Sequence, residues 1–259
     1  MDDDRFTLDG RVAIVTGAGT GIGRATARLL AARGADVVLA ARRVELLERT
    51  AAEVETHGRR ALVVPTDVTE PEQCEALVTT TVETFGRLDV LVNNAGGTHT
   101  KPHDEWTVAE WHAIVDLNLA SVWFCSRPAA ARMAERGAGS IVNISSGASF
   151  LALPDVAPYG AAKAGVNSLT RSLAAAWTPR GVRVNAVACG AVRTEGYAES
   201  GRRRAIPDDA VRGPGNAMDR VGEPDEIAHT VLFFASDASS YCSGQTLWVN
   251  GGPKAPAVV

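Results

Sequence analysis

Cysteine is scarce in this chain, and it is spread too widely to form a recognisable site. The 4 cysteines among 259 residues, Cys74, Cys125, Cys189 and Cys242, show no CxxC pair and no Cys/His grouping. This spacing argues against a disulfide framework and against a zinc site, and it is typical of a protein from a reducing compartment. We therefore expect no disulfide and no bound metal.

Long apolar runs and an excess of charge are missing as well. No stretch approaches the ~18 apolar residues of a membrane span, and the acidic start MDDDRFTLDG has no apolar core like that of a secretion signal. Lys and Arg number 26 against 30 Asp and Glu, so the formal net charge is -4 and no field attracts nucleic acid. We expect a cytoplasmic protein with neither membrane nor nucleic acid as a partner.

No linker, repeat or low-complexity tract interrupts the chain, and its composition is close to that of average globular proteins. Short runs rich in β-branched residues alternate with longer amphipathic runs from end to end. Strands are predicted over residues 11–16, 35–40, 60–65, 88–93, 140–145, 182–188 and 245–250. Helices are predicted over residues 21–33, 44–57, 71–85, 108–136, 159–178 and 224–235.

Most of the strand candidates are apolar throughout, which is typical of strands covered on both faces. The pattern predicts an α/β fold: a single domain over residues 1–259, built on a right-handed, doubly wound parallel sheet of Rossmann type. About seven strands are expected, with helices on both faces. Inside the fourth helix stands Pro128, where we expect a kink or a break into two pieces.

Residues 195–218 are rich in Arg, Gly and Pro and lack a strong periodicity. A segment of this length is typical of a lid or a binding loop, and we expect it to cover the substrate. Its arginines are Arg202, Arg203, Arg204 and Arg212. They either meet a phosphate-bearing substrate or form a solvated charge run.

A glycine-rich loop, TGAGTGIG from Thr16, separates the first predicted strand from the first predicted helix. It fits the pattern GxxxGxG through Gly17, Gly21 and Gly23, whereas a strict GxGxxG fails at Ile22 and the GKS or GKT ending of a P-loop is missing. Glycines let backbone amides approach a pyrophosphate, and the start of a helix favours negative charge. The loop predicts a dinucleotide site, and a tight turn without a ligand is the alternative.

The end of the second predicted strand indicates which dinucleotide is bound. An acidic residue there would hold the adenosine ribose 2′-hydroxyl, but this chain has Ala41 followed by Arg42 and Arg43. The position therefore lacks a carboxylate that would repel a 2′-phosphate and gains a guanidinium that can pair with one. NADP(H) is favoured over NAD(H), unless these arginines only form a solvated helix start.

Tyr159 and Lys163 are spaced to share one face of a helix, in the motif YGAAK. A free phenol has a pKa of ~10. A neighbouring ammonium and an oxidised nicotinamide would both lower the pKa of Tyr159 toward the working range of an acid/base catalyst. Alone, such a pair says little, because ordinary surface helices contain many.

The motifs above, together with several others, resemble the classical short-chain dehydrogenase/reductase family over about residues 8 to 252. They are TGAGTGIG at Thr16, DV at Asp67, NNAG at Asn93, DLNL around Asn118, NISS around Ser146, YGAAK at Tyr159 and VNGG at Val249. The stretch NNAGG followed by Lys101 and Pro102 is also similar to bacterial hydroxysteroid dehydrogenases, and the general pattern is similar to 3-oxoacyl-thioester reductases. The resemblance implies the fold predicted above and hydride transfer between a nicotinamide cofactor and a substrate.

The resemblance implies four catalytic residues. Tyr159 would be the general acid/base, and Ser146 would hydrogen-bond the substrate oxygen. The interval 159 − 146 = 13 is the family's usual one, and it selects Ser146 over Ser145. Lys163 would hold the nicotinamide ribose and tune Tyr159, and Asn118 would support a proton-relay water. In the alternative, the serine merely ends a strand and Asn118 is a satisfied polar residue inside a helix.

The resemblance also implies how the cofactor is held. Asn93, Ala95 and Gly96 are expected to line the adenosine ribose. Asp67 and Val68 are expected to touch the adenine, and Val192 and Thr194 to meet the carboxamide side. The expected cofactor-binding residues are Gly17, Thr20, Gly21, Ile22, Gly23, Arg42, Arg43, Asp67, Val68, Asn94, Ala95, Gly96, Tyr159, Lys163, Gly190, Val192 and Thr194. Asp67 has a second interpretation, as a turn residue before the helix that begins at Pro71.

Two positions depart from the family pattern. Cys189-Gly190 stands where the family usually has Pro-Gly, and Ala162 stands where it often has Ser. Loss of the proline ring predicts a looser cofactor loop, and the thiol predicts sensitivity to thiol reagents. We expect little consequence from Ala162.

The implied activity is NADP(H)-dependent interconversion of a ketone and a secondary alcohol, with a 3-oxoacyl thioester as the candidate substrate. Hydroxysteroid dehydrogenase, enoyl-thioester reductase and a non-catalytic dinucleotide sensor are the alternatives, although a sensor would not need a phenol beside an ammonium. The family mostly forms dimers or tetramers, so a homotetramer or homodimer is expected. Trp106, Trp111, Phe150 and Trp177 are either pocket walls or ordinary core.

Overall fold

The computed structural model describes residues 4–197 and 216–253 of the chain. Of the predicted lid it describes only the two ends, 195–197 and 216–218, and the four arginines of that segment lie outside the described residues. Within the described part, no helix has both the length and the apolar character needed to cross a membrane.

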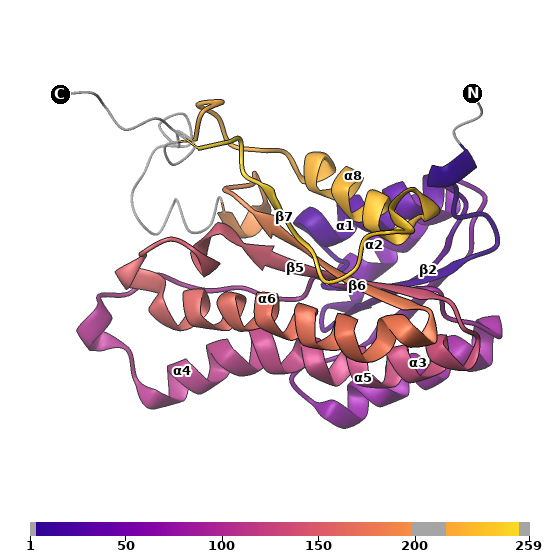
Figure 1. Ribbon diagram of the computed structural model, residues 1–259, viewed down its shortest axis with the longest axis horizontal. Helices are drawn as coiled ribbons and strands as arrows, with labels where there is room; N and C mark the ends of the chain where they lie inside the picture. Colours follow the sequence, from indigo (N-terminus) through magenta and orange to yellow (C-terminus); the bar gives the residue numbers. More distant parts are fainter. Residues whose placement is uncertain (1–3, 198–215, 254–259) are drawn as a thin grey trace.

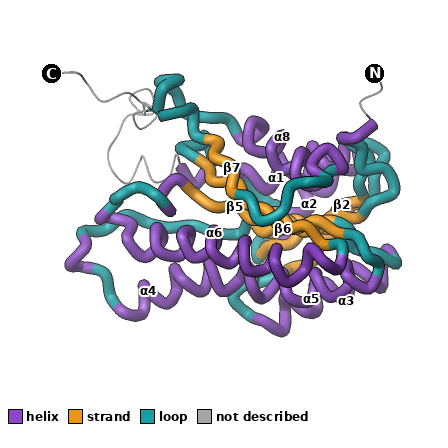
Figure 2. Tube along the Cα trace, in the orientation of Figure 1, coloured by secondary structure: helices purple, strands orange, loops and turns teal. Residues whose placement is uncertain are grey.

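Seven parallel strands form one sheet through the middle of the molecule (Figure 1; Figure 2). The strands are β1 (Val12–Thr16), β2 (Asp36–Ala41), β3 (Ala61–Pro65), β4 (Val90–Asn93), β5 (Gly139–Ser146), β6 (Val182–Cys189) and β7 (Thr246–Val249). The helices are α1 (Gly21–Ala32), α2 (Val44–Glu55), α3 (Pro71–Phe85), α4 (Val108–Val115), α5 (Ser121–Glu135), α6 (Ala157–Trp177) and α8 (Pro224–Ala235). The strand order β3-β2-β1-β4-β5-β6-β7 confirms the predicted doubly wound sheet, with its switch point between β1 and β4.

Helices cover both faces of this sheet. Figure 1 shows α1, α2 and α8 on one side and α3, α4, α5 and α6 on the other. Ala13 and Val15 of β1 belong to the core that includes α1 and α8, whereas Val12 and Ile14 belong to the core that includes α3 and α5. Because both faces are buried, the strands need no polar positions, which confirms the interpretation of the apolar runs.

The long fourth helix is divided, but not where the sequence predicts. Pro128 lies inside α5, which continues to Glu135, so the predicted break at the proline is wrong. The division falls at Asp116–Ala120, a π-helical turn between α4 and α5. There the Asn118 Nδ2 donates to the Ile114 carbonyl at 2.9 Å, the acceptor that the backbone N–H of Asn118 would use in an α-helix. A side-chain amide thus competes with the regular helical ladder.

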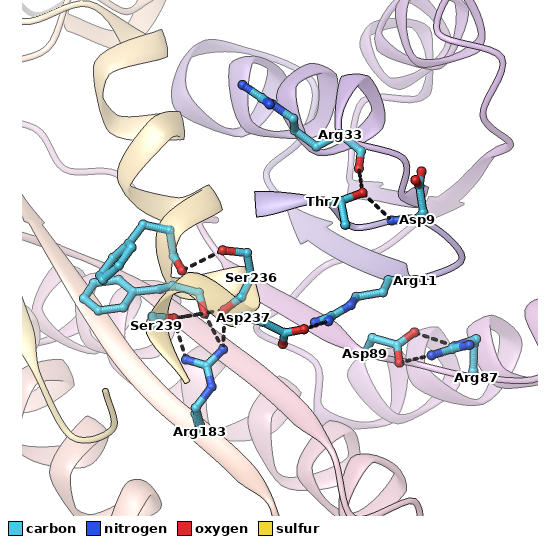
Figure 3. Close-up of polar contacts among 12 residues, drawn as sticks. Thr7, Asp9, Arg11, Arg33, Arg87, Asp89, Arg183, Ser236, Asp237 and Ser239 are labelled. Carbon is cyan, nitrogen blue, oxygen red and sulfur yellow. Dashed lines mark hydrogen bonds and ion pairs between the residues drawn. The ribbon is translucent and has the colours of Figure 1, made fainter. Parts of the chain in front are cut away.

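A half-buried guanidinium, that of Arg183, ties α8 to the amino end of β6 (Figure 3). Arg183, near the start of β6, donates to the carbonyls of Phe234 and Ser236 at 2.8 and 3.1 Å. These carbonyls lie at the C-terminal end of α8, where a cation is favoured. The amino edge of the sheet is fixed in this way, and the loops at the carboxyl edge remain to form a site.

We expect Arg183→Met to lower the free energy of unfolding by about 1.5–3 kcal/mol, because the Phe234 and Ser236 carbonyls would lose their charged donor and keep only serine hydroxyls as side-chain donors. Urea unfolding followed by circular dichroism measures the change. Arg171→Met, at an exposed position of α6, is the matched control and should leave the unfolding midpoint close to that of wild type. Equal midpoints for the two variants would contradict the anchoring role.

Candidate active site

A cleft of about 500 Å³ opens at the carboxyl ends of the strands, and the loops that follow β1 to β6 line it. Among the residues expected to bind the cofactor, all but Gly23 and Asn93 border this cleft, and among the expected catalytic residues all but Asn118 do. Gly23 and Asn118 lie directly behind its wall, against Gly17 and Gly97. The sequence-based set therefore falls on one continuous surface.

The glycine positions of the loop after β1 leave no room for a side chain. A Cβ at Gly17 would lie 2.8 Å from Asn94 Nδ2, and a Cβ at Gly23 would overlap the Gly17 carbonyl oxygen. Gly17 and Gly21 also have φ angles of 64° and 52°, which L side chains rarely adopt. Packing behind the loop accounts for Gly23, while the backbone from Gly17 to Ile22 borders the cleft.

The first turn of α1 offers backbone N–H groups to an anion. Thr20 makes no side-chain capping bond, and the turn contains no acidic residue. The Gly21 N–H instead donates to Glu195 Oε2 at 3.0 Å, from the segment after β6. A carboxylate seated on this turn demonstrates that the loop accepts negative charge, which fits a pyrophosphate. Sequence reasoning missed Glu195, because its partner is distant in the chain.

Arg42 and Asp67 form another part of the cleft wall, after β2 and β3. Arg42 Nη1 lies 3.9 Å from Asp67 Oδ2, and the Arg42 side chain is 73% exposed. Asp67 Oδ1 accepts from the hydroxyl and the backbone N–H of Thr69, and these bonds lower the pKa of Asp67. The two interpretations of Asp67, as a turn residue and as a cleft residue, therefore hold together. Thr66 also lines the cleft, and the motifs missed it.

The expectation that Asn93 lines the cofactor site is wrong. Its Nδ2 donates to Ser126 Oγ and Asn143 Oδ1 at 2.9 and 2.8 Å, inside the core. Asn94 is the asparagine that borders the cleft, and its Nδ2 donates to the Thr16 carbonyl at 2.9 Å. Successive residues at the end of a strand face different ways, so only one of the pair reaches the loop.

Ser146, Tyr159 and Lys163 come together from β5 and α6. Lys163 Nζ donates to the Ile144 carbonyl at 2.8 Å and lies 5.6 Å from the centre of the Tyr159 ring. The side chain of Ser146 lies close enough to the Tyr159 phenol to lower its pKa. Ser145 Oγ instead donates to the Lys163 carbonyl at 3.2 Å. The geometry thus brings Ser146, rather than Ser145, to the phenol.

Burial opposes the ionisation of both catalytic candidates. It raises the pKa of Tyr159 to about 12, against a smaller lowering by the Ser146 hydrogen bond. It also lowers the pKa of Lys163 to about 8. In the chain alone, the acidic phenol expected from the sequence is therefore not formed, because desolvation outweighs the lowering by Ser146.

Cys189 responds to burial in the same way as Tyr159. Its thiol borders the cleft, and burial raises its pKa to about 12, against a lowering by Lys163. A thiol that stays protonated at neutral pH is a poor nucleophile. This argues against the predicted sensitivity to thiol reagents.

Asn118 supports the loop after β4 from behind. Its Oδ1 accepts from the Gly97 N–H at 3.0 Å, and its Nδ2 donates to the Gly97 carbonyl at 2.8 Å. A Cβ at Gly96 would lie 2.7 Å from Asn118 Oδ1 and 3.4 Å from Lys163 Nζ. Asn118 is therefore a satisfied polar residue in a helix, and both Asn118 and Lys163 lie beside Gly96.

The four aromatic candidates do not border the cleft in the described part of the chain. Trp177 packs against the core on the α3 and α5 side. Phe150 is exposed, and its ring centre lies 4.3 Å from that of Trp248 on β7. The pocket-wall interpretation is thus wrong for Trp177 and finds no support for the others.

Comparison with known proteins gives a consistent result. A family model described as Enoyl-(Acyl carrier protein) reductase matches residues 17–254. The cis-4-hydroxycyclohexanecarboxylate dehydrogenase of Sinomonas cyclohexanicum is 42% identical, over 93% of this chain and 96% of its own length. The 3-oxoacyl-(acyl-carrier-protein) reductase of Synechocystis sp. is 38% identical, over 95% of this chain and 97% of its own length.

Solved structures share the fold along nearly their whole length. A 7α-hydroxysteroid dehydrogenase complexed with NADH and 7-oxo glycochenodeoxycholic acid has a TM-score of 0.90 at 31% identity, with 100% of both chains covered. A Beutenbergia cavernae protein described as an NAD(P)-dependent gluconate 5-dehydrogenase, with bound NADP, has a TM-score of 0.88 at 37% identity. That match covers 95% of this chain and 98% of the other.

We expect Tyr159 to stay protonated at pH 10 in the chain alone, where an ordinary tyrosine is half ionised. The ultraviolet absorbance of phenolate, compared between wild type and Tyr159→Phe, isolates this residue from the other tyrosines. Nearly equal phenolate absorbance in the two proteins at that pH is the expected result. A clear extra signal from wild type would show that burial does not control the phenol.

Proposed function

The chain belongs to the classical short-chain dehydrogenase/reductase family, and we propose that it is an NADP(H)-dependent oxidoreductase that interconverts a ketone and a secondary alcohol. One observation carries the proposal: Ser146, Tyr159 and Lys163 border the same cleft as the glycine loop. A proton donor and a bound dinucleotide can then act on one substrate from neighbouring positions.

The cleft fits a nicotinamide dinucleotide. Its glycines leave the backbone between Gly17 and Ile22 uncovered by side chains, and the Gly21 amide already holds a carboxylate. These amides would hold the pyrophosphate, Lys163 would hold the nicotinamide ribose, and Thr194 would meet the carboxamide. When bound, this cofactor supplies or accepts the hydride.

Tyr159 handles the proton in this proposal. With a pKa of about 12, the phenol keeps its proton throughout the neutral range and can donate it to the substrate oxygen during reduction. Ser146 donates a hydrogen bond to the same oxygen and stabilises the negative charge that develops there. Lys163, with a pKa of about 8, is mainly protonated at neutral pH and places a positive charge near the phenol. Asn118 would support a water in the proton relay.

NADP(H) is the proposed form of the cofactor. The exposed Arg42 guanidinium follows β2 beside the cleft, where Ala41 replaces an acidic residue. A guanidinium pairs well with a 2′-phosphate. The bound NADP in the Beutenbergia cavernae structure supports this choice, and the NADH in the hydroxysteroid dehydrogenase keeps NAD(H) as the alternative.

A 3-oxoacyl thioester is the proposed substrate, and the Synechocystis reductase supports it. A ring ketone that carries a carboxylate is the second candidate, because the Sinomonas cyclohexanicum dehydrogenase is 42% identical. A steroid ketone is the third candidate substrate, and the similarity to the hydroxysteroid dehydrogenase structure supports it. The placement of Ser146 in the same cleft as Tyr159 and Lys163 favours protonation of the substrate oxygen over the protonation of carbon by an enoyl reductase.

A non-catalytic sensor is disfavoured by the same residues. Burying a phenol beside a lysine is unfavourable for folding, and dinucleotide binding alone does not require it. Family membership also supports assembly as a homodimer or homotetramer in the cytoplasm, acting on a small molecule.

Tyr159→Phe should lower kcat by about 10²- to 10⁴-fold, because the proton donor is lost, while the Kd for NADPH stays close to that of wild type. Turnover is followed as NADPH oxidation with acetoacetyl-CoA, 4-oxocyclohexanecarboxylate and a steroid ketone, and binding as NADPH fluorescence. Tyr241→Phe, at an exposed position, is the matched control and should keep full activity.

Strong residual turnover in Tyr159→Phe would contradict the role of the phenol. Mass analysis of the product separates the candidates, since carbonyl reduction yields a hydroxy compound and enoyl reduction a saturated thioester. Failure of wild type to oxidise NADPH with every substrate would contradict the proposed substrate classes.

Arg42→Ala should raise the Kd for NADPH by about 10- to 100-fold, which corresponds to the loss of hydrogen bonds between charged groups. The Kd for NADH should change little, because NADH has no 2′-phosphate. Arg49→Ala, at an exposed position of α2, is the control for a general change in surface charge. Equal losses for NADPH and NADH would argue against the assignment of Arg42.

A further inference from the structure

Glu195 completes the first turn of α1 from a distant part of the chain. The Gly21 N–H donates to Glu195 Oε2 at 3.0 Å, although the two residues are 174 positions apart. Thr20 gives this helix no side-chain cap, and the turn has no acid of its own. The carboxylate therefore lies where an anion binds at the start of a helix.

The residues on either side of Glu195 form a local turn that lies against Gly21. The Thr194 hydroxyl accepts from the Tyr197 N–H at 3.1 Å. A Cβ at Gly21 would lie 2.9 Å from Thr194 Cγ2 and 3.7 Å from Glu195 Oε2. Gly21, Thr194 and Tyr197 all border the cleft. The carboxylate thus occupies the same loop that would hold phosphate oxygens.

The charges make this position exclusive. A carboxylate and a pyrophosphate are both anions, so they repel each other when they share a few N–H donors. Arg24 on α1 lies near enough for the Glu195 charge to raise its pKa, but its Nε and Nη2 donate to Glu53, so it makes no hydrogen bond to Glu195. Repulsion therefore disfavours binding of a pyrophosphate at the first turn of α1 while the Glu195 carboxylate accepts from the Gly21 N–H.

We propose that the Glu195 carboxylate is an internal competitor of the cofactor, which occupies the pyrophosphate position on α1 and must leave before the dinucleotide binds. This inference rests on the proposed function and adds a residue that sets cofactor affinity. The apparent Kd is the intrinsic Kd divided by the fraction of chains in which the carboxylate has left. Occupation in about nine chains of ten weakens cofactor binding about tenfold.

Glu195→Gln and Glu195→Ala both remove the competing charge. Fluorescence titration should give a Kd for NADPH about 3- to 10-fold below that of wild type at low ionic strength. The difference should shrink at high salt, because salt screens the repulsion. Glu48→Gln, an exposed carboxylate on α2, removes the same charge elsewhere and should leave the Kd unchanged. Circular dichroism verifies that each variant is folded.

The outcomes separate this inference from the proposed function. An unchanged or higher Kd in both Glu195 variants overturns the inference and leaves the proposed function intact. Equal tightening in Glu48→Gln also overturns it, because net charge would then be the cause. If wild type binds neither NADPH nor NADH, the proposed function fails and the inference fails with it.

Discussion

The site depends on one close approach, where the loop after β1 meets the loop after β4. The Thr16 hydroxyl accepts from the backbone N–H groups of Asn94 and Ala95 at 3.0 Å each, and the Asn94 side chain donates to the Thr16 carbonyl. Glycine is required at Gly17 because no side chain fits between these loops. The same few bonds therefore position the anion-binding amides and the wall that leads to the catalytic residues, at the switch point of the sheet.

In the chain alone, burial and an internal carboxylate set the state of the two parts of the cleft. At one, burial favours a neutral phenol at Tyr159 and weakens the ammonium of Lys163. At the other, the Glu195 carboxylate uses the N–H group that a pyrophosphate needs. Under the proposed function, a positive nicotinamide would lower the pKa of Tyr159, and a pyrophosphate would compete with the Glu195 carboxylate.

The sheet could be predicted from the sequence because its strands are buried on both faces and therefore read as apolar runs. The glycine spacing likewise predicted the position of the loop, because a side chain at Gly17 or Gly23 would clash with neighbouring atoms. Prediction failed where a side chain replaces a backbone partner: the helix divides at Asn118 and not at Pro128. The motif NNAG also could not show that Asn93 points into the core while Asn94 reaches the cleft. The position of each residue along the strand decides this. Glu195 gave no local signal, because its partner is 174 positions away.

The π-helical turn at Asp116–Ala120 constrains how this protein can evolve. The Asn118 amide bonds Ile114 in its own helix and both backbone groups of Gly97 in the loop beside the cleft. A residue without a donor here would leave the Ile114 and Gly97 carbonyls without this partner, and a residue without an acceptor would leave the Gly97 N–H without one. A substitution at this single position would thus alter the shape of a helix and of a loop at once, whether or not the residue takes part in any reaction.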